Sequence, residues 1–520
     1  MTRTVTRTFV TRFLPALPAA SLTAVSLPAV LGLTTALAFG PLAALAQDTS
    51  ATTKQYDEGG IYEGAFTNGV QNGIGTYRLP DGFEYTGEWV MGVIEGQGIA
   101  KYPNFSVYEG HFSAGKPDGT GKITYPDGGT YEGDWVAGTI TGEGRATYAG
   151  GVTYEGSFKD GLHDGVGRMT GPDGYVYEGD WVAGAKEGTG KVTHTDGSTY
   201  VGAMAANARN GAGVLTFPNG YSLDCTWVDN LCEGTGTLTQ PGGDTYVGDL
   251  VGGKREGTGT VTYANGDSYE GQFVADKRQG SGTFTGTDGY EYVGDWVEGR
   301  IEGKGRVTYP DGSVYEGDFL DDLPHGTGTI TYTGGTTYTG AWQYGVIEGT
   351  GVLTYANGLV YEGAFHNAKN EGKGRMTYTD GFVYDGDWVA GEREGQGVAT
   401  YADGTRYEGG FVAGKREGMG TLTMPSGFTY EGEWKAGEIE GTGVATYANG
   451  DRYEGNFAAG KRQGAGVILY ASGQTASGRW EDGELVEPTP QEDSSQEDSG
   501  QEDSGQDSTA QSQSDAGAGE

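Results

Sequence analysis

The stretch YEGDWVAGTITGEG at residues 131–144 ends in a glycine pair, Gly142 and Gly144, with the G-x-G spacing of loops that bind nucleotide phosphates. Such a loop needs a strand before it and a helix after it, because the helix N-terminus faces the phosphate. No helical periodicity follows Gly144, and the same G-x-G recurs 18 times along the chain. These glycines therefore indicate architecture, and no cofactor is predicted.

Histidines and carboxylates could carry catalysis or bind metal. The chain has only five histidines, scattered singly, at positions without metal-ligand spacing. No nucleophile, base and orienting group can be assembled from so few. We predict neither a metal site nor a catalytic site, and hence a protein that is not an enzyme. The alternative is an enzyme that acts on envelope glycans between carboxylates.

Cys225 and Cys232 are the only cysteines, seven residues apart. In an oxidising compartment this spacing favours a local disulfide. The strand register expected below is a counter-argument, because it places residue 225 opposite a residue near 236. Two unbonded cysteines therefore remain the alternative.

A 23-residue repeat supplies the elements that position these residues. Its marker is a tyrosine, here called the lead tyrosine and given offset 0. Glycine occupies offsets 2, 11, 13 and 20, a large apolar residue offset 4, an aliphatic residue offset 15 and usually tyrosine offset 17. About 19 repeats run in register from 62 to 483, with Leu223 and Ala476 at two of the lead positions. The lead tyrosines are Tyr62, Tyr85, Tyr108, Tyr131, Tyr154, Tyr177, Tyr200, Tyr246, Tyr269, Tyr292, Tyr315, Tyr338, Tyr361, Tyr384, Tyr407, Tyr430 and Tyr453.

The repeat predicts an all-β fold. Offsets 0–5 alternate apolar and polar like a strand, and offsets 11–17 are predicted as a second strand. Asp-Gly or Asn-Gly at offsets 19–20 predicts a tight reversal between repeats. We expect an elongated array of about 19 stacked antiparallel β-hairpins, as a twisted single-sheet meander or a groove.

Glycines and rings are predicted to share one face of this sheet, because side chains alternate along a strand. A ring can then cover the glycine of the neighbouring strand. An open face of this kind would need a cover, such as a coiled groove, a second copy or a ligand. The predicted structural residues are Tyr131, Trp135, Tyr177, Trp181, Tyr292, Trp296, Tyr384, Trp388, Tyr430 and Trp434, with Gly133, Gly142 and Gly144.

The units YEGDWVAGTITGEGRATYAGG at 131–151 and YEGEWKAGEIEGTGVATYANG at 430–450 resemble the MORN repeat (membrane occupation and recognition nexus). The resemblance covers nearly all of the chain after residue 61. It implies an elongated array of stacked hairpins with scaffolding, membrane-associated or protein-binding roles. It also implies that a homodimer could form through array ends.

Residues 1–46 have the pattern of a secretory signal. Three arginines precede an uncharged stretch that closes on Ala-Leu-Ala, so cleavage is predicted between Ala46 and Gln47. An uncleaved membrane anchor is the alternative. A short linker at 47–61, the repeat array at 62–483 and a disordered acidic tail at 484–520 would follow. The array is expected in two blocks joined near 204–250, where the alternation of Phe and Trp at offset 4 breaks.

The net charge of −38 argues against nucleic acid as a partner. Acidic residues at offset 1 form a ladder on the predicted wet face, and Lys-Arg pairs such as Lys415-Arg416 could contact an anionic lipid surface. The leading hypothesis is an exported, non-enzymatic repeat scaffold of the periplasm or cell envelope, whose partner is an unidentified protein or a second copy. Peripheral membrane binding is the second hypothesis.

Overall fold

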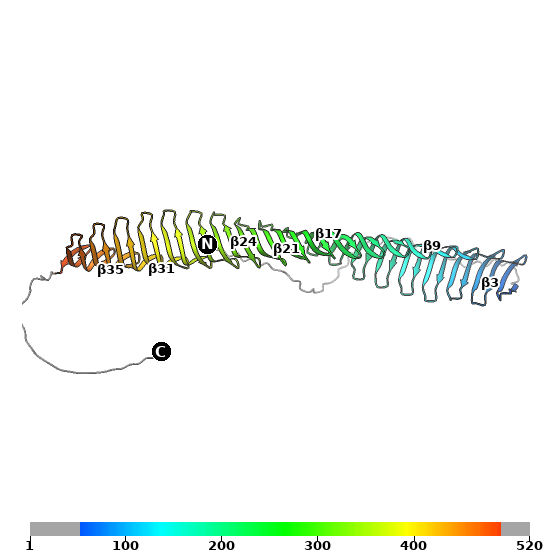
Figure 1. Cartoon of the computed structure of the whole chain (residues 1–520). Helices are drawn as coiled ribbons and strands as arrows, with labels where there is room; N and C mark the ends of the chain where they lie inside the picture. The colour runs from blue at the N-terminus through cyan, green and yellow to red at the C-terminus, as the bar shows by residue number, and fades with distance from the viewer. Residues whose placement is uncertain (1–51, 490–520) are drawn as a thin grey trace, which may run out of the picture.

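The structure, a computed structural model, describes residues 52–489. They form one antiparallel sheet of 39 strands, in which each strand pairs with its neighbours in the sequence, and they build the long body of Figure 1. No helix in this part of the chain could span a membrane. The all-β array of stacked hairpins predicted from the repeat is confirmed.

The strands of the N-terminal half are β1 Thr52–Gln55, β2 Ile61–Thr67, β3 Val70–Arg78, β4 Glu84–Val90, β5 Val93–Lys101, β6 Val107–Ser113, β7 Lys116–Thr124, β8 Thr130–Val136, β9 Thr139–Thr147, β10 Thr153–Lys159, β11 Leu162–Thr170, β12 Val176–Val182, β13 Ala185–Thr193, β14 Thr199–Ala205, β15 Ala208–Thr216, β16 Ser222–Val228, β17 Leu231–Thr239, β18 Thr245–Val251, β19 Lys254–Thr262 and β20 Ser268–Val274. Those of the C-terminal half are β21 Lys277–Thr285, β22 Glu291–Val297, β23 Arg300–Thr308, β24 Val314–Leu320, β25 Leu323–Thr331, β26 Thr337–Gln343, β27 Val346–Thr354, β28 Val360–His366, β29 Lys369–Thr377, β30 Val383–Val389, β31 Glu392–Thr400, β32 Arg406–Val412, β33 Lys415–Thr423, β34 Thr429–Lys435, β35 Glu438–Thr446, β36 Arg452–Ala458, β37 Lys461–Leu469, β38 Thr475–Glu481 and β39 Glu484–Pro488.

Two kinds of turn alternate, and their positions correct the prediction. Ala137 and Gly138, both with positive φ, join β8 to β9 in a two-residue turn of the type I′ kind. The second strand therefore begins at offset 8, not offset 11. Between repeats the Tyr148 N–H donates to the Val152 carbonyl, and Gly151 at φ +80° donates to the Tyr148 carbonyl. This is a three-residue loop with a bulge glycine, so offsets 19–20 are not a two-residue reversal.

A bulge explains the G-x-G motif. In the β8–β9 register Gly133 faces Gly144 and Trp135 faces Ile140, so β9 carries two extra residues between these pairs. Gly142 lies in the bulge at φ +108°, where a side chain would be strained. A Cβ on Gly144 would fall 2.5–2.6 Å from Oη and Cζ of Tyr131. One glycine permits the bulge, and the other lets the tyrosine ring lie against the backbone.

Side chains satisfy the backbone groups that the bulge leaves unpaired. Asp134 has no partner in the β8–β9 register, and the Tyr131 hydroxyl donates to its carbonyl at 3.0 Å. The Asp134 carboxylate in turn accepts from the Glu143 N–H at 2.9 Å. The hydroxyl bond recurs at every lead tyrosine. Each of these tyrosines therefore packs its ring in the fold and also donates a hydrogen bond to the backbone.

The rings form a chain along the array on either side of the central repeats. Tyr131 lies edge-on to Trp135 of its own repeat at 5.6 Å between centroids, and to Phe158 of the next repeat at 5.0 Å. Most lead tyrosines join two repeats in this way through edge-to-face contacts, a favourable geometry for aromatic pairs. The exceptions lie where Met204, Leu223 and Leu250 replace rings. Since one repeat cannot bury its own rings, these contacts make the stability of each repeat depend on its neighbours.

All nine tryptophans stand at offset 4 and donate Nε1–H to the glycine carbonyl at offset 13 of the preceding repeat. The Trp296 bond to Gly282 is 3.2 Å.

Replacing Trp296 with phenylalanine should therefore lower the unfolding free energy by about 1 kcal/mol. Phenylalanine occupies offset 4 in other repeats, so the change keeps an aromatic ring there and removes one hydrogen bond. Urea unfolding followed by circular dichroism would measure the change. A Phe273→Leu variant, which loses a ring at the same offset, should cost more, and the reverse order would contradict this assignment.

The sheet is folded along its long axis, so that the ring face becomes a core. Offsets 9 and 17 would lie about 26 Å apart on a flat strand. Yet His163, at offset 9, meets the hydroxyl of Tyr148, at offset 17 of the previous repeat, at 2.8 Å. Tyr131 and Trp135 are 2% and 6% exposed. The chain itself covers its rings, so of the expected covers, a coiled groove, a second copy or a ligand, the structure shows the first.

The segments outside the predicted array also contain strands. β1 lies within the expected linker at 47–61 and pairs with β2. β39 lies in the expected tail and pairs with β38. Strand pairing continues through 204–250 as one sheet. The predicted signal, its cleavage site at Ala46 and Gln47, and the acidic tail beyond residue 489 lie outside the described residues.

Candidate functional site

The aromatic residues predicted as structural are core and do not form a binding surface. Their exposed fractions are 0–6%. They are Tyr131, Trp135, Tyr177, Trp181, Tyr292, Trp296, Tyr384, Trp388, Tyr430 and Trp434. A partner must therefore meet other residues.

Residues 52–489 contain no cluster of three or more His, Cys, Asp or Glu side chains able to hold a metal ion. His163 stacks on the Tyr154 ring at 3.7 Å, and burial lowers the pKa of His163 to about 4. Residues at offset 14 lie between the acidic residues at offset 1 of the two neighbouring strands. Lys122, for example, pairs with Glu109 on one side and with Glu132 on the other. In this part of the array, basic residues separate the carboxylates, and each carboxylate lies beside a lysine or arginine.

In three of the Lys-Arg pairs, the arginine is used in contacts between repeats. Arg416 lies over the Trp434 ring at 4.1 Å and donates to the Gly437 carbonyl of the next turn at 2.7 Å. Arg278 and Arg462 lie over their tryptophans at 4.4 and 4.2 Å. Two of the lysines, Lys277 and Lys461, also pair with Glu298 and Asp482 at 3.3 and 3.2 Å, so the basic charge available to lipid is smaller than the sequence indicates.

Side chains at offset 10 clamp each repeat to the next, a role that sequence reasoning missed. Asp118 accepts a hydrogen bond from the Ala137 N–H, in the two-residue turn of the following repeat, at 2.9 Å. Glu371 and Glu417 do the same at 2.8 and 2.7 Å. The recurrence of Asp, Glu, Asn or Gln at offset 10 was the available signal.

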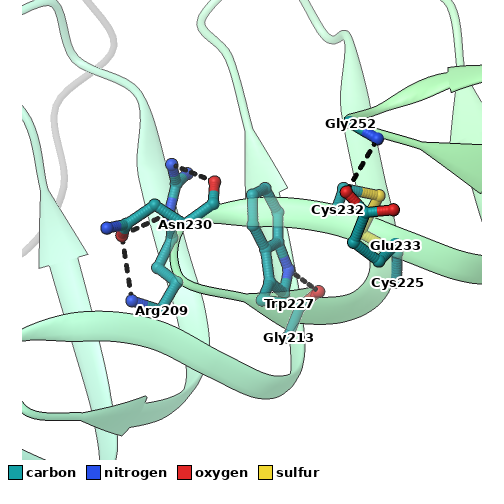
Figure 2. Close-up of a disulfide and its surroundings, with 8 residues drawn as sticks. All are labelled: Arg209, Gly213, Cys225, Trp227, Asn230, Cys232, Glu233 and Gly252. Atoms are coloured by element: carbon teal, nitrogen blue, oxygen red, sulfur yellow. Dashed lines mark hydrogen bonds between the residues drawn. A yellow bond between two sulfur atoms is a disulfide. The ribbon is translucent and has the colours of Figure 1, made fainter.

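Cys225 and Cys232 are joined by a disulfide in the structure, with Cα atoms 5.8 Å apart (Figure 2). The β16–β17 register pairs Asp224 with Thr237 and then Thr226 with Glu233, so it skips Cys225. The bulge therefore lets residue 225 reach residue 232 instead of 236. This repeat has Leu223 in place of its lead tyrosine, so the disulfide lies where a ring is missing.

Reducing this disulfide should destabilise the central repeats by about 2.5 kcal/mol, the loop entropy of a short closed segment. Hydrogen exchange with and without reductant would localise the change to β15–β18. The matched control restores the common repeat residues with Leu223→Tyr, Cys225→Gly and Cys232→Ile. That variant should not respond to reductant, and a response equal to that of the parent would contradict the stapling role.

A cavity of about 360 Å³ opens where Gln240 replaces the usual tyrosine at offset 17. Its polar wall is Arg255 and Asp276, which already bond to each other at 3.4 Å. The groups that could bind a ligand there are thus used within the fold.

Tyrosines at offset 17 form the remaining unusual surface. Five consecutive repeats carry one each, and we call this set the tyrosine ladder: Tyr309, Tyr332, Tyr355, Tyr378 and Tyr401. Two strands separate successive members, about 9.6 Å. Tyr332 and Tyr401 are 38% and 37% exposed, and the other three are half-buried. Each member of the ladder directly follows a strand, from Tyr309 after β23 to Tyr401 after β31.

The hydroxyls of the tyrosine ladder are unused. Within residues 52–489 none of the five makes a hydrogen bond, whereas every lead tyrosine does. The pKa of Tyr309 is raised to about 12, mainly by burial and to a smaller extent by the nearby Tyr332 and Asp311. Burial and then Asp311 raise the pKa of Tyr332. The hydroxyls of Tyr309 and Tyr332 are therefore protonated donors at neutral pH.

The described residues form an all-β array of similar hairpins with buried lead rings, which is the architecture of an elongated repeat protein. The MORN repeat model matches 18 consecutive segments that run from residue 62 to residue 475, and the eighth match begins at 226, just after the disulfide-bonded Cys225. The chain belongs to the MORN repeat family.

The comparison with curated proteins gave no match. Similar solved structures include the SAS-4 (dCPAP) TCP domain of Drosophila Melanogaster in complex with a proline-rich motif of Ana2 (dSTIL), at 17% identity and TM-score 0.21 over 30% of this chain and 85% of that chain. A streptogramin B lyase structure matches at 11% identity and TM-score 0.11 over 56% and 90%. Likenesses at these scores carry no argument about function.

Proposed function

We propose that this chain is an exported, non-enzymatic scaffold of the periplasm or cell envelope that binds a protein partner along its length. The proposal rests on the observation that most side chains at the repeat positions hold the fold together, whereas one regular set does not. Rings, hydroxyls, carboxylates and arginines at the repeat positions are used to hold repeats together. A regular, unused surface remains on the tyrosine ladder. Such an array offers a long, preformed surface rather than a pocket.

The test uses the chain from Gln47 onward, immobilised and incubated with detergent extract of cell envelopes. A partner that binds in stoichiometric amounts and survives a high-salt wash supports the proposal. A chain carrying Gly144→Ala, argued below to disrupt the array, serves as the control. Recovery of the same proteins on both columns, or of none, would count against a scaffold.

Location needs its own experiment. Fusing residues 1–60 to a phosphatase that is active only after export should give an active reporter. An inactive fusion with a cytoplasmic protein product would overturn the envelope assignment while leaving partner binding open.

Peripheral membrane binding is a second candidate, favoured by one edge of the array. Exposed valines at offset 5 lie opposite lysines at offset 8, as Val251 faces Lys254 and Val274 faces Lys277, whose ammonium pairs with Glu298 at 3.3 Å. Apolar groups beside lysines suit an anionic lipid surface. Co-sedimentation with anionic vesicles at low salt, lost in Lys254→Gln/Lys277→Gln, would support it. Absence of binding would remove it.

A further inference from the structure

The tyrosine ladder has a spacing that selects a ligand. Its five members are evenly placed because the repeat length does not vary between Tyr309 and Tyr401. Four intervals of about 9.6 Å give a length of about 38 Å. Any ligand that uses all five tyrosines must present equivalent groups at this period.

A polyproline II helix has this period. It has three residues per turn and rises about 3.1 Å per residue, so one turn advances about 9.3 Å. About 12 residues span about 37 Å, the length of the ladder. Small differences in period can be absorbed by the half-buried rings over so few turns.

The chemistry agrees with the spacing. A polyproline II backbone has no internal hydrogen bonds, so its carbonyls are free to accept from side chains. Aromatic grooves bind such helices through ring contacts with proline, and the stiff ligand loses little entropy. The ladder offers both groups, since each ring is partly exposed and each hydroxyl is an unused donor. Ser313, in the turn after Tyr309, adds a buried Oγ without a partner in the described chain.

Charge narrows the ligand further. Acidic residues stand in the turns that follow the ladder tyrosines, at Asp311, Asp380 and Asp403, and the whole chain carries −38. Their carboxylates accept backbone hydrogen bonds in those turns, which holds them beside the ladder. Basic residues next to the prolines would meet these carboxylates.

We infer that the tyrosine ladder binds a proline-rich, basic segment of a partner protein in the polyproline II conformation, one residue triplet per tyrosine. This inference rests on the proposed scaffold function and names the chemistry of its partner.

The experiment uses the chain from Gln47 onward and a fluorescein-labelled peptide of about five Arg-Pro-Pro triplets, measured by fluorescence anisotropy at moderate salt. Saturable binding is expected. A peptide of Arg-Gly-Ser triplets has the same charge and should bind at least about tenfold more weakly, because it is not preorganised. The triple variant Tyr309→Phe/Tyr332→Phe/Tyr355→Phe keeps the rings and removes three donors, so it should also bind about tenfold more weakly.

Tyr263→Phe is the matched control, because Tyr263 occupies the same offset between Gln240 and Gly286 and has no ladder neighbour. It should bind like the parent. Equal binding of both peptides, or unchanged binding by the triple variant, would overturn the inference. So would binding of a cello-oligosaccharide in place of the peptide. If the envelope extract still yields a partner in that case, the scaffold proposal stands and only this assignment falls.

Discussion

Replacing Gly144 with alanine is expected to destabilise the array by about 3 kcal/mol and to create a protease-sensitive site within β8–β10. The added methyl would lie 2.5–2.6 Å from Oη and Cζ of Tyr131. That ring cannot move aside, because it is 2% exposed and is held edge-on between Trp135 and Phe158. Gly144 has no positive φ, so the cost is steric and belongs at the upper end of overpacking effects.

The control is Gly150→Ala, six residues away. Gly150 lies in the loop between repeats, with no heavy atom within 4 Å of the added Cβ and no positive φ. This change should leave stability within about 0.5 kcal/mol. Limited proteolysis with mass mapping and urea unfolding would measure both variants. If Gly144→Ala resisted protease as well as Gly150→Ala does, the close contact between the Tyr131 ring and the Gly144 backbone would not be needed for stability.

Repeat length and residue type were enough to predict the fold class. The tyrosine, glycine and large apolar residue at alternate positions indicate a strand with one buried face, which holds at Tyr131, Gly133 and Trp135. Glycine beside a ring predicted their close approach, and Gly144 lies against Tyr131. These features are local, since they depend on neighbours in one strand or in one hairpin.

The sequence left a twisted meander and a groove open, and it did not predict where the sheet folds along its axis, because this depends on residues of no single type. Offset 9 is isoleucine at 140, histidine at 163 and arginine at 416, so it has no recognisable pattern. His163 contacts the Tyr148 hydroxyl across the folded sheet, whereas Arg416 lies over the Tyr407 and Trp434 rings. The bulge depends on the positive φ of Gly142, and the sequence does not separate this role from other roles of glycine.

The candidate surface was hidden for a similar reason. Tyr309 and Tyr315 are tyrosines on the same predicted face, and only the structure separates them. Tyr315 donates to Asp318, whereas the Tyr309 hydroxyl has no partner in the described chain. Whether a tyrosine hydroxyl donates a hydrogen bond depends on the backbone of the folded bulge, so the sequence alone does not show it.

Raising the pH from 10 to 12 is expected to unfold the whole array in one narrow transition. Burial raises the pKa of many lead tyrosines from 10.0 to about 12. The neutral phenol is thus favoured in the folded state. The resulting stability is fully present below pH 10, where both states are protonated, and is lost as pH rises through about 12.

The transition should be steep because the tyrosines are coupled through the array. Ionising Tyr131 would remove its hydrogen bond to Asp134 and place charge between Trp135 and Phe158, which weakens two repeats at once. Tyrosinate absorbance and far-ultraviolet circular dichroism should therefore change together. The chain unfolded in guanidinium should titrate near the ordinary pKa of about 10. If the full complement of tyrosines ionised near pH 10 while the strand signal persisted, the lead rings could not be the buried links between repeats.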